Sequence, residues 1–235
     1  KLGNGSFNKT KDVALMLAES LVSVAKQAGL QCEAVLTDMN QVLGWNAGHS
    51  LEIIECVEFL VNKKKNKRLE MVTNELSASV LMMAKKIDKK EAINKINQVI
   101  NNGTAAEKFD KMVHALGGPM NILESYNNHL PRASHNNQVL AEQTGFIQSI
   151  ETRKLGLLLI ELGGGRKQIK DSIDYSVGFE NVIGVGDYVE STSPLLTLHS
   201  SSKDYFDSLK KQIQECFKIS KSKSEKLDII YQTIK

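Results

Sequence analysis

The sequence has few cysteines and prolines, and it has no long apolar run. Its three cysteines, Cys32, Cys56 and Cys216, lie far apart and form no CxxC pair. This excludes a disulfide framework and indicates a reducing compartment, so we expect a cytoplasmic protein. No apolar stretch approaches the roughly 18 residues that a membrane-spanning helix needs, so we expect no membrane partner. The five histidines show no metal-ligand spacing, and we therefore expect no zinc site.

Positive and negative side chains are also nearly balanced in number. The formal net charge is +3, which demands neither a nucleic acid nor an acidic membrane as partner. The basic run 63–68 could contact a nucleic acid, but it lacks interleaved aromatic residues or glycines. We interpret it as a solvated connector between helices and expect no nucleic-acid partner.

Motifs of several enzyme classes are missing. There is no GxGxxG fingerprint, no Walker loop and no GxSxG elbow, so dinucleotide, ATP and serine-hydrolase functions have no support. Glycines do cluster at residues 3–6 and 163–166, where main-chain N–H groups could bind an anion. A plain turn at the first cluster is the favoured alternative, as is a helix C-cap with tight packing at the second.

The first part of the chain shows an α/β rhythm. Residues 10–29 predict a helix, because apolar residues recur at helical spacing at Val13, Leu17, Leu21 and Val24. An apolar run at residues 32–38 then predicts a buried strand that ends in polar residues. Ligands in such folds bind beyond the carboxyl ends of strands, which makes residues 37–40 a candidate location.

The predicted elements change from helices to mostly short strands along the chain. Helices are predicted at about 49–62, 67–87, 89–101 and 104–116, followed by strands at 139–142, 145–150, 176–179, 188–189 and 195–199. Helices at about 152–162 and 202–219 and a closing strand at 227–231 complete the second half. The predicted fold class is α/β: a partial mixed α/β domain at 1–118, a linker at 119–138 and a smaller α+β domain at 139–235.

Several segments, taken in order, resemble the thymidine and pyrimidine-nucleoside phosphorylases. KLGNGSF resembles the DVKxGxGAF turn of that family, residues 36–60 resemble its LTDMNQPLGxxxGNALEVxEAI block, and residues 108–118 resemble FxxMVxAQGG with a departure at Leu116. In the second half, residues 144–146, 152–153, 162–166, 174–179, 186–189 and 194–195 resemble the bacterial thymidine phosphorylases in particular. The resemblance covers essentially the whole chain.

The resemblance implies a pentosyltransferase that carries out phosphorolysis. Inorganic phosphate attacks the anomeric carbon of a pyrimidine 2′-deoxynucleoside, and the products are the free base and 2-deoxyribose 1-phosphate. The family uses no organic cofactor and is homodimeric. Its phosphate- and pyrimidine-binding residues precede the DVK turn, so we expect no catalytic residue among these 235 residues. We therefore expect the carboxyl-terminal part of a larger enzyme, inactive by itself and without the family's dimer contact.

Four residues carry roles over from the family. Phe7 matches the aromatic residue that walls the base pocket. Leu43 and Asn46, through main-chain carbonyls, and Glu55, through its carboxylate, match half of a structural potassium site. Asn46 replaces a usual small residue, which matters little for a carbonyl ligand.

Three hypotheses remain open from the sequence. The first is a pyrimidine-nucleoside phosphorylase represented by part of its chain. The second is a folded remnant or interaction module without catalysis, and the third is a phosphate- or nucleic-acid-binding module that uses the lysine run. The resemblance favours the first.

Overall fold

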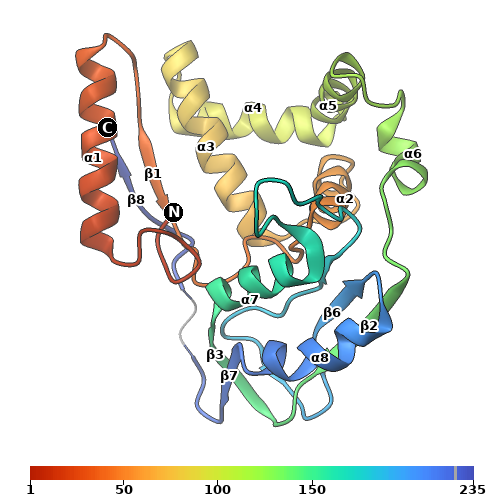
Figure 1. Ribbon diagram of the computed structural model, residues 1–235. Helices are drawn as coiled ribbons and strands as arrows, with labels where there is room; N and C mark the ends of the chain where they lie inside the picture. The colour runs from red at the N-terminus through yellow and green to blue at the C-terminus, as the bar shows by residue number, and fades with distance from the viewer. Residues whose placement is uncertain (225–226) are drawn as a thin grey trace. The chain divides into compact units, whose positions relative to one another are not determined.

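The computed structural model describes residues 1–224 and 227–235 and divides the chain into two units (Figure 1). Residues 1–52 and 132–235 form the first unit, and residues 53–131 form the second. Helices and small sheets occur together, so the fold class is mixed α/β, as predicted. The domain limits at 118 and 139 stay predictions, since these units group the residues in another way.

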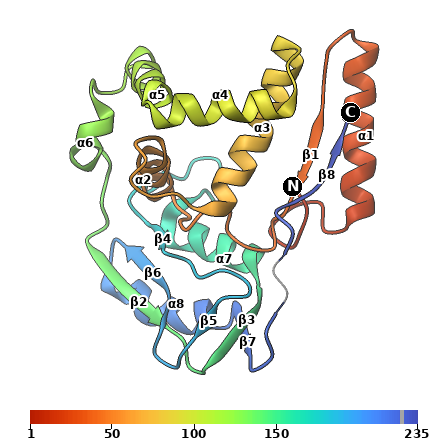
Figure 2. The ribbon, with the colours of Figure 1, turned by 180° about the vertical axis from the view of Figure 1, so that it is seen from behind.

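The first unit begins with a helix that packs on a pair of strands. Helix α1 (Lys11–Gln27) is followed by β1 (Ala34–Thr37), which pairs antiparallel with β8 (Ile230–Ile234) near the end of the chain. Figures 1 and 2 show α1 alongside this pair. The predicted closing strand at 227–231 therefore begins later than expected, and its partner lies in the first part of the chain.

The apolar residues whose spacing predicts α1 are not the residues through which this helix packs. The four residues at the predicted spacing are 45% to 62% exposed: Val13, Leu17, Leu21 and Val24. Three other residues are buried instead, the small Ala14 and Ala18 together with Val22. Small side chains let the helix lie close to the two strands, which cover only one flank of its broad apolar surface. The helix was predicted correctly from this spacing, which did not identify the face that packs.

The second part of the first unit consists of two three-stranded antiparallel sheets with two helices (Figure 2). One sheet has the order β2-β6-β4, from β2 (His135–Leu140), β4 (Gly178–Glu180) and β6 (Pro194–Ser200). The other has the order β5-β3-β7, from β3 (Gly145–Ile150), β5 (Tyr188–Val189) and β7 (Phe217–Ser220). Helices α7 (Thr152–Leu159) and α8 (Lys203–Gln214) complete it. The sequence did not predict β7.

The largest hydrophobic core of the described residues lies in this part. Strand β6 contributes Leu196 and Leu198, β3 contributes Ile147, and α8 contributes Leu209 and Ile213, all of them fully buried. Burying one such side chain contributes about 1.5–3 kcal/mol, so a cluster of this size stabilises the two sheets and their helices together.

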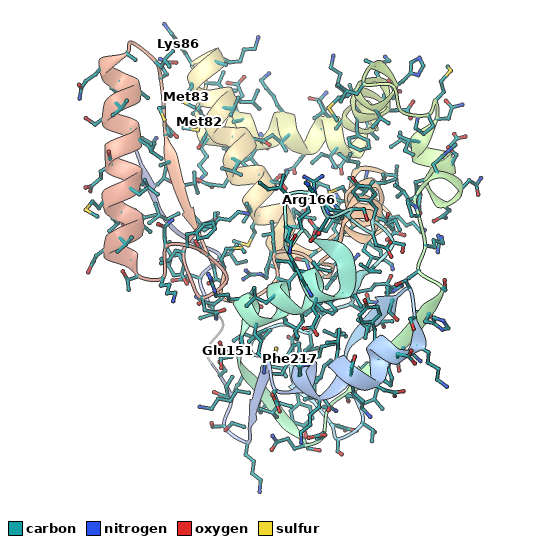
Figure 3. The ribbon with its side chains drawn as sticks, viewed as in Figure 1. Met82, Met83, Lys86, Glu151, Arg166 and Phe217 are labelled. Carbon is teal, nitrogen blue, oxygen red and sulfur yellow. The ribbon has the colours of Figure 1, made fainter. Side chains whose placement is uncertain are left out.

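The glycine run after α7 ends the helix, as the favoured interpretation of the sequence predicted. Residues Ile160–Gly164 form one π turn, and Gly163 adopts a φ of 101° that suits glycine. A Cβ on Gly164 would lie 2.7 Å from the Leu159 Cδ1 atom, so the glycine permits close packing. Arg166, labelled in Figure 3, follows this run.

The second unit is helical. Helix α2 (His49–Leu60) enters it from the first unit, and α3 (Lys67–Lys85), α4 (Lys89–Asn101), α5 (Thr104–Ala115) and α6 (Ile122–His129) follow. The Asn66 side chain caps α3 by accepting two backbone N–H bonds, and Lys86 ends the helix in the left-handed conformation (Figure 3). Helix α6 lies within the predicted linker 119–138, where Asn and Pro suggested only irregular chain.

Within residues 1–224 and 227–235, no helix is both long enough and apolar enough to span a membrane.

The burial of Cys216 predicts selective thiol reactivity. Cys216 is 1% exposed, and loss of solvent raises the pKa of its thiol to about 11, against a smaller opposing effect of Lys154. Only roughly one such thiol in a thousand is ionised near pH 8, and the thiolate is the reactive form. A disulfide reagent should therefore label the partly exposed Cys32 and Cys56 in the native chain, and Cys216 only after unfolding. Three thiols reacting at similar rates before unfolding would contradict this packing.

Candidate functional site

A glycine-rich turn lies beside the carboxyl end of β1. We call residues 3–6 the glycine turn. The Leu2 N–H donates to the Thr37 carbonyl at 2.8 Å, and the Met39 N–H donates to the Leu2 carbonyl at 2.7 Å, which forms a parallel bridge. The Gly5 N–H then donates to the Met39 carbonyl at 2.9 Å. The glycine turn therefore lies beside residues 37–40, for which ligand binding stays a prediction from the sequence.

Asp38, at this strand end, anchors a polar network although it is only 2% exposed. Its Oδ1 atom accepts hydrogen bonds from the Asn40 backbone N–H at 3.1 Å, the Asn40 Nδ2 at 2.7 Å and the Tyr231 hydroxyl at 3.1 Å. Burial, followed by the negative charge of Asp38, raises the pKa of Tyr231. The carboxylate therefore ties the end of β1 to a residue of β8.

The network continues into the glycine turn. The Asn4 backbone N–H donates to the Asn40 Oδ1 atom at 2.9 Å. Gly3 has a φ of 133°, and a Cβ there would lie 2.7 Å from the same Asn40 oxygen. A Cβ on Gly5 would lie 2.7 Å from both the Met39 carbonyl oxygen and the Thr152 Cγ2 atom. Glycine thus permits close packing at both positions and, at Gly3, an unusual backbone conformation.

Phe7 follows the glycine turn and is 94% exposed. Its ring is available to a ligand or to another surface, and its role as the wall of a base pocket stays a prediction.

The loop after β1 is fastened to the second part of the first unit. The Val185 N–H donates to the Gln41 side-chain oxygen at 3.0 Å, and the Val182 N–H donates to the Trp45 carbonyl at 2.8 Å. Ala47 pairs with Phe179 through two backbone hydrogen bonds, at 2.8 and 2.9 Å. These bonds position the loop against the segment that carries β4.

Asn46 is held through both ends of its amide. Its Nδ2 donates to the Leu51 carbonyl at 3.1 Å, and its Oδ1 accepts from the Asn181 N–H at 3.1 Å. The residue thus joins the start of α2 to the turn after β4. The sequence had suggested a role only for its main-chain carbonyl.

The predicted potassium ligands come from the loop and from α2. Leu43 and Asn46 lie on the loop, half-buried, and Glu55 is a buried residue of α2 in the second unit. Two main-chain carbonyls and a carboxylate are oxygen donors that suit a hard cation. The potassium site itself stays a prediction. Within residues 1–224 and 227–235, no three His, Cys, Asp or Glu side chains gather to hold a metal ion.

Comparison with known families decides what this part of the chain is. Residues 146–220 match the family model of the pyrimidine nucleoside phosphorylase C-terminal domain. The chain carries the C-terminal domain of the pyrimidine nucleoside phosphorylase family. The matched residues include β3 to β7, α7 and α8 but not β2, and the match confirms the family resemblance of this part of the chain. The enzymes of this family are pentosyltransferases.

Sequence reasoning missed the residues that dock the loop and the turn onto the pyrimidine nucleoside phosphorylase C-terminal domain. Gln41 and Asn4 bond to partners more than 140 residues away along the chain. Spacing within the sequence carries no signal for such pairs, although an uncharged amide in a glycine-rich or apolar segment is a general hint of a buried hydrogen bond.

Replacing Tyr231 should weaken the strand-end network. In Tyr231→Phe the carboxylate of Asp38 loses one donor, and the free energy of unfolding should fall by about 1–2 kcal/mol. Urea unfolding followed by the fluorescence of Trp45, the only tryptophan, measures this. Because the pKa of Tyr231 is raised, its contribution should be complete at neutral pH and should disappear only as the pH rises above about 10.

The matched control for this variant is Tyr188→Phe. Tyr188 is 54% exposed on β5, so its substitution should change the stability by less than about 0.5 kcal/mol. Equal losses in the two variants would show that the bond to Asp38 contributes nothing.

Proposed function

We propose that this chain serves the phosphorolysis of thymidine and other pyrimidine 2′-deoxynucleosides. The observation that supports this most is the match of residues 146–220 to the C-terminal domain of the pyrimidine nucleoside phosphorylases. The glycine turn and the loop after β1, which resemble the catalytic part of that family, are hydrogen-bonded to this domain.

In the proposed reaction, an oxygen of inorganic phosphate forms a bond to the anomeric carbon while the bond from that carbon to the base nitrogen breaks. The electron pair leaves with the base, which takes up a proton. Such a reaction needs groups that bind an anion, stabilise positive charge at the sugar and hydrogen-bond the departing base. No organic cofactor takes part.

Within this scheme, a few residues of the chain have supporting roles. Phe7 stacks against the pyrimidine, and its high exposure leaves the ring face accessible. Leu43, Asn46 and Glu55 contribute oxygen ligands to a structural potassium ion. The resemblance implies that the phosphate-binding residues and most of the base-binding residues lie outside the 235 residues, so we propose that these residues alone do not turn over substrate.

A paired assay tests the proposal. Purified residues 1–235 and the product of the longest reading frame that contains them are each incubated with thymidine, with and without phosphate. We expect phosphate-dependent release of thymine from the longer product and none from residues 1–235. Turnover by residues 1–235 alone would contradict the proposed division of labour. An inactive longer product would instead favour a folded module without catalysis.

Phe7→Ala in an active longer product should raise the KM for thymidine at least about fivefold, since aromatic stacking on a base contributes about 1–3 kcal/mol. The maximal rate should change less, because the ring contacts the substrate in both the ground and the transition state. Ile169→Ala is the matched control, because Ile169 is also 94% exposed but lies in the loop after the glycine run. An unchanged KM in Phe7→Ala would remove Phe7 from the base site.

A further inference from the structure

Asn4 joins the glycine turn to the pyrimidine nucleoside phosphorylase C-terminal domain. Its Nδ2 donates to the Ile150 carbonyl at 2.9 Å, and its Oδ1 accepts from the Arg153 N–H at 3.3 Å. Ile150 is the last residue of β3, and Arg153 lies in the first turn of α7. One side chain therefore contacts both ends of the short connection between this strand and this helix.

The start of α7 has an orphan donor that only a distant residue satisfies. The first N–H groups of a helix have no partner within it. Glu151, which precedes α7 and is labelled in Figure 3, provides no side-chain cap, and its own N–H donates to the Cys216 carbonyl at 2.8 Å. The Asn4 side chain accepts the hydrogen bond of the Arg153 N–H in place of a cap, although the two residues are 149 positions apart in the sequence.

An asparagine suits both bonds because its amide carries a donor and an acceptor. An aspartate would keep the acceptor for the Arg153 N–H but would set a carboxylate oxygen against the Ile150 carbonyl. An alanine would lose both bonds. The identity of the residue, and not only its size, is therefore matched to this position.

The glycine turn itself is closed by local hydrogen bonds. The Ser6 N–H donates to the Gly3 carbonyl at 3.0 Å, and the Gly3 N–H donates to the Asn8 carbonyl at 3.1 Å. The backbone N–H groups of Asn4 and Gly5 bond the turn to the chain after β1. Its attachment to the C-terminal domain is made by the Asn4 side chain and by the close approach of Gly5 to Thr152. Phe7 comes directly after it.

We infer that Asn4 is a positioning residue, through which the C-terminal domain holds the glycine turn and thereby orients Phe7. The significance of Phe7 rests on the proposed function, but the holding of the turn does not. The C-terminal domain then acts on the base site without contacting the substrate itself.

Nuclear magnetic relaxation of amide groups in residues 1–235 tests this inference. In the unaltered chain, the Ser6 and Phe7 amides should have order parameters near about 0.85, and in Asn4→Ala these should fall below about 0.6. Asn4→Asp, which keeps one of the two side-chain bonds, should give intermediate values. A merely stabilising residue would change the unfolding temperature without loosening these amides selectively.

Asn8→Ala is the matched control in the same segment. It removes only the side-chain bond from Asn8 to the Lys1 carbonyl, at 3.3 Å, and should leave both order parameters unchanged. The inference is overturned if Asn4→Ala keeps the Ser6 and Phe7 amides rigid, or if Asn8→Ala loosens them equally. If Asn4→Ala does not fold, Asn4→Asp decides in the same way.

Failure of this inference and failure of the proposed function give different results. The relaxation measurement needs no turnover. A turn that loosens in Asn4→Ala, together with an inactive longer product, would keep Asn4 as the positioning residue while showing that Phe7 faces another ligand. If the turn stays rigid in Asn4→Ala and the longer product is active, the proposed function stands and only the positioning role of Asn4 is rejected.

Discussion

The buried carboxylate of Asp38 is the constraint on which the first unit depends. One oxygen of this side chain accepts from Tyr231 and twice from Asn40, and Asn40 in turn accepts from the Asn4 backbone. Burying a charge is costly unless donors surround it, so these donors must be in place for the strand end to be stable. The requirement fixes the glycine turn, the end of β1 and strand β8 relative to one another.

The same logic explains why the first 52 residues group with the C-terminal domain and not with the helices that follow them. The loop after β1 leaves few of its polar groups to solvent. Gln41, Trp45 and Asn46 each accept an N–H from the segment between β4 and β5. A loop held at several points keeps its carbonyls in defined directions, which an ion site would require.

The sequence predicted the types of most elements well, since helical periodicity and short apolar runs are local signals. It predicted α4 to the residue, because Asp88 caps the helix and Asn102 ends it. It failed where partners are remote. The spacing that predicted α1 did not identify its buried face, because the contact with β1 and β8 selects Ala14, Ala18 and Val22. Helix α6 was missed because Asn and His outweighed its apolar positions, Ile122 and Tyr126. The family resemblance, which no single motif carried, came from the order of several motifs.

The pairing of β1 with β8 has a consequence for the making of the protein. Tyr231 and Asp38 are separated by 193 positions, so β1 cannot pair with β8 until all the intervening chain has been synthesised. Contacts between such distant segments form slowly, because the chain must lose the entropy of a long loop before any bond repays it. Until then, β1 and the apolar surface of α1 are exposed to other chains. During translation, association with other chains therefore competes with folding at β1 and α1.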